Sequence, residues 1–304
     1  MANRWWIYQK ERFPILAHGP MIAAFSSSAV SYSALLRGSV RLPSLATSMV
    51  AFLTALIFFL QLRIADEFKD FEADARYRPY RPVPRGLVQL SELGWIGATG
   101  ALFQLFFALV LDPSLSLILL GVWVYLALMS KEFFVARWIK TRPVTYLWTH
   151  MIIMPLIDFY ATACDWMRAQ GIPPRGLFWF LVMSFFNGTV VEIGRKIRVP
   201  QDEETGVPTY TLLWGRTAAT LAWLGNLLAS ALIAFLAARE IHFLFPVIFL
   251  LTPLWILVAW MGWDFVQRPC SRSARRFESF SGLWMLCLYL SLGIIPLIWR
   301  SFSQ

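Results

Sequence analysis

Long apolar stretches recur along the whole chain, and no other feature of the sequence limits its possible folds as strongly. A helix that crosses a membrane needs about 20 mostly apolar residues, and nine stretches of the 304-residue chain reach or approach that length. Their approximate bounds are 14–36, 44–62, 92–111, 115–131, 144–164, 177–193, 217–237, 243–263 and 279–299. With 58% hydrophobic and 15% charged residues, a water-soluble fold could not bury this much apolar surface. We therefore predict an all-α, polytopic membrane bundle of about nine transmembrane helices.

The basic residues divide unequally between the two ends of such a bundle. Lys and Arg concentrate in the cytoplasmic loops of membrane proteins, and a cytoplasmic N-terminus would put most of the 27 Lys and Arg residues on that side. The opposite side would keep only Arg37, Arg41, Arg168, Arg175, Arg239 and Arg300. We therefore expect a cytoplasmic N-terminus, and we interpret the net charge of +9 as a sign of topology rather than of nucleic-acid binding.

No long linker interrupts the apolar stretches, so we expect one domain over residues 1–304. Residues 1–12 are polar and aromatic, which predicts that no cleavable targeting segment is present. The scattered histidines His18, His150 and His242 are expected to pack rather than to bind metal. Asp158 falls inside an expected span, where we favour a structural pairing with a neighbouring helix over contact with an acceptor substrate.

Acidic residues gather after the second apolar stretch. On a helix, Asp66, Asp70 and Asp74 recur every four residues and share one face. Like charges at this spacing repel each other, so a basic side chain or a divalent cation should gather there. A solvated, charged helix end is the simpler interpretation of these acids taken alone.

A basic, proline-rich loop follows these acids directly. Its arginines are Arg76, Arg78, Arg81 and Arg85. Mg²⁺ commonly binds through one or two carboxylates together with substrate phosphates, and guanidinium groups pair with phosphate oxygens. The acids and arginines together therefore indicate a site for a metal ion and a diphosphate.

A second charged cluster lies between the sixth and seventh apolar stretches, on the same predicted face. It contains Asn187, Glu192, Arg195, Lys196, Arg198, Asp202, Glu203 and Glu204. Glu192 lies near the end of an apolar helix, where an ionisable group is costly and is by default a functional candidate. A salt bridge to Lys196 is the competing interpretation. We expect the two clusters to face each other over one cavity, with Asp70 and Asp202 opening into the same pocket.

At these residues the sequence resembles the UbiA superfamily of intramembrane prenyltransferases. The first motif of that family, N-D-x-x-D-x-x-x-D followed by Y-R-P-x-P-x-G, is matched at residues 66–74 and 80–86, with Asp66 and Glu67 in place of Asn and Asp. Residues 206–215 are similar to the family's G-x-x-[ST]-x-x-x-x-x-G segment. The second acidic motif departs from the usual D-x-x-x-D, because Arg198 stands four residues before Asp202. The resemblance covers essentially the whole chain and implies the UbiA fold.

The resemblance also implies two Mg²⁺ ions between the two clusters and the diphosphate of an allylic prenyl donor. The metal ligands would be Asp66, Glu67, Asp70, Asp74, Glu192 and Asp202. Lys131 is similar to a family lysine at the end of the fourth helix that contacts diphosphate, although its i−4 neighbour is Ala127 rather than tyrosine. The substrate contacts would be Arg78, Arg81, Lys131, Lys196 and Asn187, with Arg81, Lys131 and Lys196 stabilising the leaving diphosphate.

Transfer of the prenyl chain to an aromatic or other lipophilic acceptor, within membrane lipid and at the cytoplasmic face, is the leading interpretation. A terpene cyclase of the same superfamily would instead quench the allylic cation within its own chain. A cation transporter is a third possibility, which we disfavour because the charges gather at one face, whereas transport sites lie near the membrane midplane.

Overall fold

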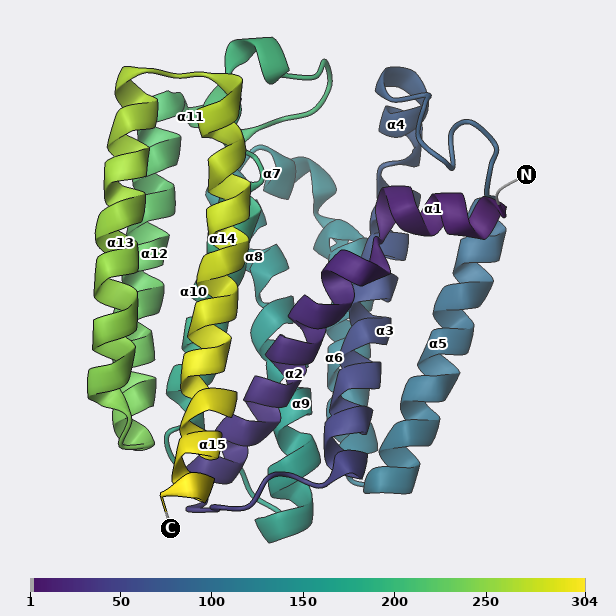
Figure 1. Cartoon of the computed structure of the whole chain (residues 1–304). Helices are drawn as coiled ribbons and strands as arrows, with labels where there is room; N and C mark the ends of the chain where they lie inside the picture. Colours follow the sequence, from purple (N-terminus) through teal and green to yellow (C-terminus); the bar gives the residue numbers. More distant parts are fainter. Residues whose placement is uncertain (1–2, 304) are drawn as a thin grey trace.

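The computed structural model describes residues 3–303 as a bundle of long helices with several short helices at one end (Figure 1). No β-strand occurs within these residues, and the expectation of an all-helical bundle is confirmed. The elements are α1 (Arg4–Arg12), α2 (Ile15–Leu36), α3 (Leu45–Lys69), α4 (Phe71–Tyr77), α5 (Leu90–Leu111), α6 (Leu115–Ser130), η1 (Glu132–Phe134), α7 (Ala136–Lys140), α8 (Pro143–Met151), α9 (Ile153–Gln170), α10 (Leu177–Gly194), η2 (Pro200–Asp202), α11 (Tyr210–Trp214), α12 (Arg216–Glu240), α13 (Leu244–Gln267), α14 (Ser271–Leu292) and α15 (Ile294–Phe302).

The long helices account for all nine expected apolar stretches. Within the described chain, 7 spans are long and apolar enough to cross a membrane, with α8–α9 and α14–α15 each counted as one. The pair α1–α2, bent by 54°, adds an eighth if it is a broken span. Helix α6 is apolar but has only 16 residues. Every expected stretch is therefore helical, while nine crossings stay a prediction.

Two of the expected single spans contain a break. The stretch 144–164 divides between α8 and α9 at Ile152, and the stretch 279–299 divides between α14 and α15 at Gly293. In each case the second helix has a proline at its third position, Pro155 or Pro296. A proline in the first turn of a helix loses no intrahelical hydrogen bond. The breaks therefore lie where a new helix can begin at little cost.

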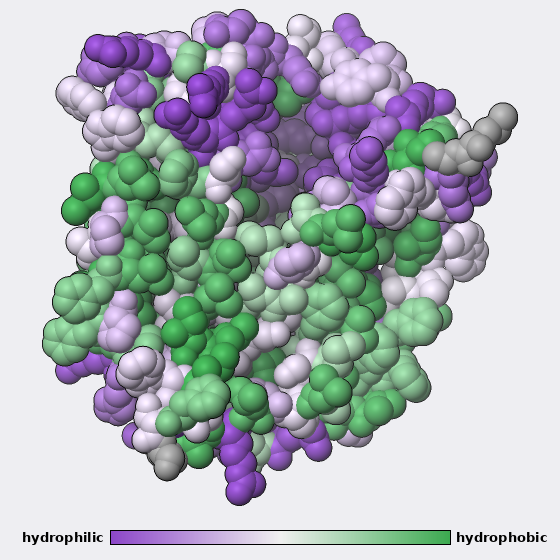
Figure 2. Space-filling model, viewed as in Figure 1, coloured by the Kyte–Doolittle hydropathy of each residue, from purple (hydrophilic) through white to green (hydrophobic). Residues whose placement is uncertain are grey.

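The outer surface of the bundle fits a hydrocarbon environment. Figure 2 shows a broad hydrophobic band over the middle of the molecule, with hydrophilic groups at its two ends. Large apolar side chains are exposed on the spanning helices α5 and α13, including Leu102, Phe106, Phe249 and Trp260. An exposed apolar surface of this extent marks an interface with other molecules, and together with the spanning helices it identifies an integral, multi-pass membrane protein.

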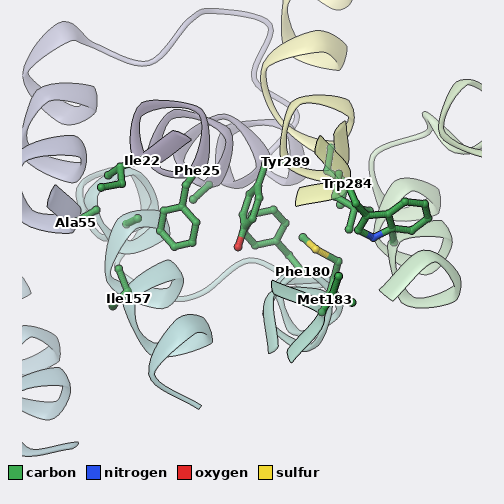
Figure 3. Packing of buried hydrophobic residues seen from close by; sticks show 14 of the residues in the cluster. Ile22, Phe25, Ala55, Ile157, Phe180, Met183, Trp284 and Tyr289 are labelled. Atoms are coloured by element: carbon green, nitrogen blue, oxygen red, sulfur yellow. The ribbon is translucent and has the colours of Figure 1, made fainter. Parts of the chain in front are cut away.

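Aromatic side chains fill the centre of the bundle, and one buried acid, Asp158, lies among them. Figure 3 shows Phe25 and Phe180 on either side of Tyr289, with ring centroids 4.9 and 5.7 Å from that of Tyr289. The Tyr289 hydroxyl lies 2.6 Å from Oδ2 of Asp158 and 3.1 Å from the Ser184 hydroxyl. Through the Tyr289 hydroxyl, the fully buried Asp158 links α9 to α14 and α10. This is the structural pairing that we favoured from the sequence.

Gly293 allows its backbone to pack closely against the backbone of α2. A Cβ atom on Gly293 would lie 2.4 Å from the Cα and carbonyl oxygen of Ser28 in α2. Backbone atoms cannot turn aside as a flexible side chain can, and small residues are the usual means of close helix approach in membranes. We therefore predict that Gly293→Ala lowers the free energy of unfolding by about 1–3 kcal/mol.

Thermal unfolding in detergent tests this prediction, with Gly225→Ala in α12 as its matched control. A Cβ on Gly225 would have no heavy atom within 4 Å, so this change should leave stability unaltered or slightly raised. Equal melting temperatures for the two variants would contradict the role that we assign to Gly293.

Candidate active site

The first acidic motif spans the junction of α3 and α4. Asp70 ends α3 and precedes α4, and its backbone N–H donates to the Asp66 carbonyl at 2.9 Å. The Asp66 carboxylate lies 3.6 Å from Nζ of Lys69 and 3.8 Å from Nη1 of Arg63. Asp70 is half-buried and forms no salt bridge with any of residues 3–303. Asp66 and Asp70 are therefore the motif acids with the loosest pairing.

The surroundings of Asp70 favour an added cation. Burial raises the pKa of its carboxyl group, and although Lys69 lowers that pKa, the charges of Asp66 and Asp74 raise it further, so that it lies above the ordinary value. Repulsion between carboxylates is relieved when a divalent cation binds between them. Within the described chain, no three His, Cys, Asp or Glu side chains are close enough to hold a metal by themselves. Asp66 and Asp70 therefore fit Mg²⁺ with phosphate oxygens completing its coordination.

Asp74 organises the arginine loop in this structure. Its buried carboxylate lies 2.5 Å from Nη2 of Arg78 and 2.7 Å from Nη1 of Arg81. Each guanidinium group contacts one oxygen of the carboxylate, and short contacts between opposite charges of this kind hold the arginines in place. The structure thus brings together three predicted site residues, and direct ligation of a metal by Asp74 would require the exchange of these arginines.

Glu67 lies on another face of α3. Its side chain is buried and forms a salt bridge with Arg12 of α1. This contact ties the short N-terminal helix to the helix that carries the acidic motif. The predicted role of Glu67 as a metal ligand stays a prediction, and its observed role is to anchor α1.

Glu192 is paired within the second cluster. Its carboxylate accepts from Arg195 at 2.5 Å and from Lys196 at 2.8 Å, where α10 ends. This is the arrangement that the salt-bridge interpretation required. The Lys196 ammonium also lies 5.7 Å from the ring centroid of Tyr210, within the range of a cation–π interaction. Glu192 therefore positions two cations that can meet an anionic substrate.

The remaining predicted site residues are more dispersed. Asp202 accepts from the Ser271 hydroxyl at 3.0 Å, at the start of α14, rather than facing the first motif. Asn187 is buried in α10, and its side-chain amide has no hydrogen-bond partner among residues 3–303. Lys131 is exposed after α6 and forms no salt bridge within the same residues. Their predicted roles stay predictions.

The loops that follow the two motifs meet directly. The Tyr77 ring, at the end of α4, packs so closely on Gly206 that a Cβ there would lie 2.4–2.6 Å from ring atoms. The Tyr80 hydroxyl donates to the Glu204 carboxylate at 3.4 Å, a long contact. Residues far apart in the sequence thus close over one end of the bundle, where Figure 2 shows a hollow among hydrophilic groups.

The charges of the two clusters also interact across this end of the bundle. Glu192 raises the pKa of the Arg195 guanidinium well above its ordinary value, and Asp66 of the first motif contributes to the rise. The facing of the two clusters over one cavity, with Asp70 and Asp202 opening into the same pocket, stays a prediction.

A further polar cluster beside Asp66 was missed by reasoning from the sequence. It comprises Lys69 of α3, Glu132 of η1, and Tyr146 and His150 of α8. No spacing within any one segment identifies this cluster, since its members come from three elements. Only the left-handed backbone at Glu132 distinguishes the segment, and that property is not visible in the sequence.

The fold and the site together define a helical membrane protein whose acidic and basic residues gather at one end. The chain belongs to the UbiA prenyltransferase family, whose sequence pattern matches residues 23–288. This assignment confirms the resemblance that the two motifs indicated. Among curated proteins, no sequence matches this chain.

Solved structures support the same fold. A UbiA homologue from Aeropyrum pernix K1 has a TM-score of 0.68 at 12% identity, over 90% of this chain and 96% of the homologue. A structure of digeranylgeranylglyceryl phosphate synthase has a TM-score of 0.58 at 15% identity, over 98% of this chain and 99% of the synthase. A UbiA homologue from Archaeoglobus fulgidus, bound to DMAPP and Mg²⁺, has a TM-score of 0.53 at 13% identity, over 91% of this chain and 97% of the homologue.

The contact between Tyr77 and Gly206 allows a test of whether the loops after α4 and α10 hold each other in place. We predict that Gly206→Ala loosens both loops, because the added Cβ meets the Tyr77 ring and the residue has φ of +76°. Hydrogen–deuterium exchange should accelerate in residues 71–80 and 203–209. Gly86→Ala is the matched control, since Gly86 has the same φ with no heavy atom within 4 Å of its Cβ position.

Two outcomes of that experiment are informative. Faster exchange in both loops for Gly206→Ala, and only local change for Gly86→Ala, would support the contact. If Gly206→Ala accelerates exchange in residues 203–209 alone, the two loops do not depend on each other.

The pairing of Glu192 leads to a separate prediction. Glu192→Gln removes the charge that holds Arg195 and Lys196, so we expect lower thermal stability and at least about tenfold weaker binding of inorganic diphosphate, with an unchanged Mg²⁺ requirement. Calorimetric titration with diphosphate at several Mg²⁺ concentrations measures both quantities. A raised Mg²⁺ requirement with unchanged diphosphate binding would instead assign Glu192 to the metal.

Proposed function

We propose that this protein transfers an allylic prenyl chain from a prenyl diphosphate to an aromatic or other lipophilic acceptor, with Mg²⁺ as its metal. One observation carries the proposal: the loops that follow the two charged clusters meet at one end of an apolar bundle, where the Tyr77 ring packs on Gly206. A molecule with a diphosphate head and a hydrocarbon tail suits this boundary. The Archaeoglobus fulgidus homologue solved with DMAPP and Mg²⁺ supports the same class of donor.

We assign the chemistry to this chain's residues as follows. The bond between the allylic carbon and the diphosphate oxygen breaks, a bond from that carbon to the acceptor forms, and the acceptor loses a proton. When bound, Mg²⁺ supplies Lewis-acid stabilisation of the leaving diphosphate. Arg81, Lys131 and Lys196 donate hydrogen bonds to the same negative charge, while Arg78 and Asn187 orient the diphosphate.

The pairing of the acids suggests an order among the proposed metal ligands. Asp66 and Asp70 have the loosest pairing, so we propose them as the first ligands of Mg²⁺. The other acids have close partners in this structure, and they would hold a second Mg²⁺ only after exchanging them. These acids are Glu67, Asp74, Glu192 and Asp202.

We further propose that the site faces the cytoplasm, because most basic residues belong to loops at this end. The acceptor and the prenyl tail would reach the site from the surrounding lipid, since the band below the charged end is apolar (Figure 2). Acceptor identity and donor chain length are open to direct assay.

Product analysis tests the proposed function. Purified protein in lipid nanodiscs is incubated with allylic prenyl diphosphates of increasing chain length, with Mg²⁺ or with a chelator, and with a panel of phenolic and lipid alcohol acceptors. Mass spectrometry should find a prenylated acceptor that depends on Mg²⁺. A cyclised hydrocarbon formed from the diphosphate alone would favour the cyclase, and no release of diphosphate from any donor would refute both activities.

Asp70 provides the sharpest single variant. Asp70→Asn should lower turnover on the order of 100-fold, because it removes one of two carboxylates proposed to hold the metal. Glu72→Gln is the control, since Glu72 is an exposed acid on the adjacent helix α4. Circular dichroism and melting temperature confirm that both variants fold. Full activity of Asp70→Asn at limiting Mg²⁺ would remove this carboxylate from the mechanism.

A further inference from the structure

Lys69 occupies a position that ought to weaken a metal site. It follows Asp66 by three residues and precedes Asp70 directly. Its ammonium nitrogen lies 3.6 Å from the Asp66 carboxylate. A tethered cation so close to a ligand competes with a divalent ion for the same charge. The question is what keeps Lys69 from closing on Asp66.

The structure contains a competing set of partners for Lys69. Nζ donates to the Tyr146 hydroxyl at 2.8 Å and lies 3.8 Å from Oε1 of Glu132. At 3.6 and 3.8 Å, the carboxylates of Asp66 and Glu132 attract the ammonium group almost equally by Coulomb's law. The hydrogen bond to Tyr146 is the shortest of these three contacts and ties the ammonium group to α8.

The chain adopts a disfavoured backbone to bring Glu132 there. Glu132, Phe133 and Phe134 have φ of 49°, 53° and 59°, three consecutive non-glycine residues in the left-handed region. Such residues persist only where the surrounding structure requires them, and they gather at functional sites. Glu132 is 4% exposed, and neither carboxylate oxygen has a hydrogen-bond partner of good geometry among residues 3–303. Its contribution is therefore its charge rather than a hydrogen bond.

Glu132 carries that charge at neutral pH. Burial alone would raise the pKa of its carboxyl group, but the nearby His150 imidazole and Lys69 ammonium lower it below the ordinary value, with a smaller effect from Lys140. The Glu132 side chain is therefore a buried carboxylate that attracts the Lys69 ammonium group from 3.8 Å, in competition with Asp66.

His150 fixes the other side of this arrangement. Its Nδ1 lies 2.8 Å from the Tyr146 carbonyl oxygen, and because a carbonyl only accepts, Nδ1 carries the hydrogen. Its Nε2 lies 3.4 Å from Oε2 of Glu132, so the imidazolium, with a hydrogen on both nitrogens, is the form that attracts this carboxylate. The imidazole also stacks on the Tyr146 ring, with centroids 3.9 Å apart. In that form His150 contacts both Glu132 and Tyr146, the two further partners of the Lys69 ammonium group.

We propose that Glu132, Tyr146 and His150 are positioning residues that hold Lys69 away from the Asp66 and Asp70 carboxylates and thereby set their affinity for a divalent cation. The inference rests on the proposed function only in taking these two carboxylates as metal ligands. It predicts that loss of Glu132 and loss of Lys69 change the affinity for the metal in opposite directions. Loss of the Glu132 charge releases Lys69 to Asp66 and weakens metal binding, whereas loss of Lys69 itself removes the competitor and strengthens binding.

Mn²⁺ binding, measured by electron paramagnetic resonance on the full-length protein in nanodiscs without any prenyl donor, tests the proposal. Glu132→Gln should raise the Mn²⁺ dissociation constant about tenfold, and Lys69→Met should lower it. The double variant should bind as Lys69→Met does, because Glu132 acts through Lys69. Tyr146→Phe keeps the ring on His150 and should shift binding in the same direction as Glu132→Gln, which preserves the test if Glu132→Gln does not fold.

Two controls separate this inference from the proposed function. Glu72→Gln should leave Mn²⁺ binding unchanged, and Asp70→Asn should largely abolish it. Weaker binding in Lys69→Met, or an equal loss from Glu132→Gln with and without Lys69, would overturn the positioning role while leaving the metal site intact. Mn²⁺ binding that survives Asp70→Asn would remove the metal site itself, and both proposals with it.

Discussion

Charges at the edge of a hydrocarbon layer need partners, and this constraint orders the whole candidate site. An ionisable group there is costly unless it is paired or hydrated, and a buried pair that loses one member leaves an uncompensated charge. Asp74, Glu67 and Glu192 each have a close basic partner. Asp66 has none nearer than 3.6 Å, and Asp70 has no salt bridge within residues 3–303. A bound cation therefore gains most from these two acids.

The acids of the first motif consequently fall into two groups: Glu67 and Asp74 form close ion pairs that hold the structure together, whereas Asp66 and Asp70 are left loosely paired. Asp74 fixes the guanidinium groups of Arg78 and Arg81, and Glu67 fastens α1 to α3. The loops that these contacts shape then meet the loop after α10, where Gly206 admits the Tyr77 ring. Apolar helices supply the rigid frame, and the ion pairs place the polar end upon it.

The sequence predicted those features that depend on short segments. Apolar length predicted the helices, and the four-residue spacing of Asp66 and Asp70 predicted the first charged cluster, because both properties are local. The close approach of α2 to Gly293 depends on helix packing, which no local pattern records. The partner that an acid such as Glu192 selects, and the proximity of Glu132 to α3, depend on the packing of helices distant in sequence.

Lys69 and Lys196, one in each charged cluster, give the site its own counter-ions before any substrate arrives. A divalent ion alone must then compete with an ammonium group for Asp66. Under the proposed function, a diphosphate would attract the same ammonium groups and free the carboxylates, so each ligand would raise the affinity for the other, by the same factor in both directions. Loading of the site by donor and metal would then be cooperative.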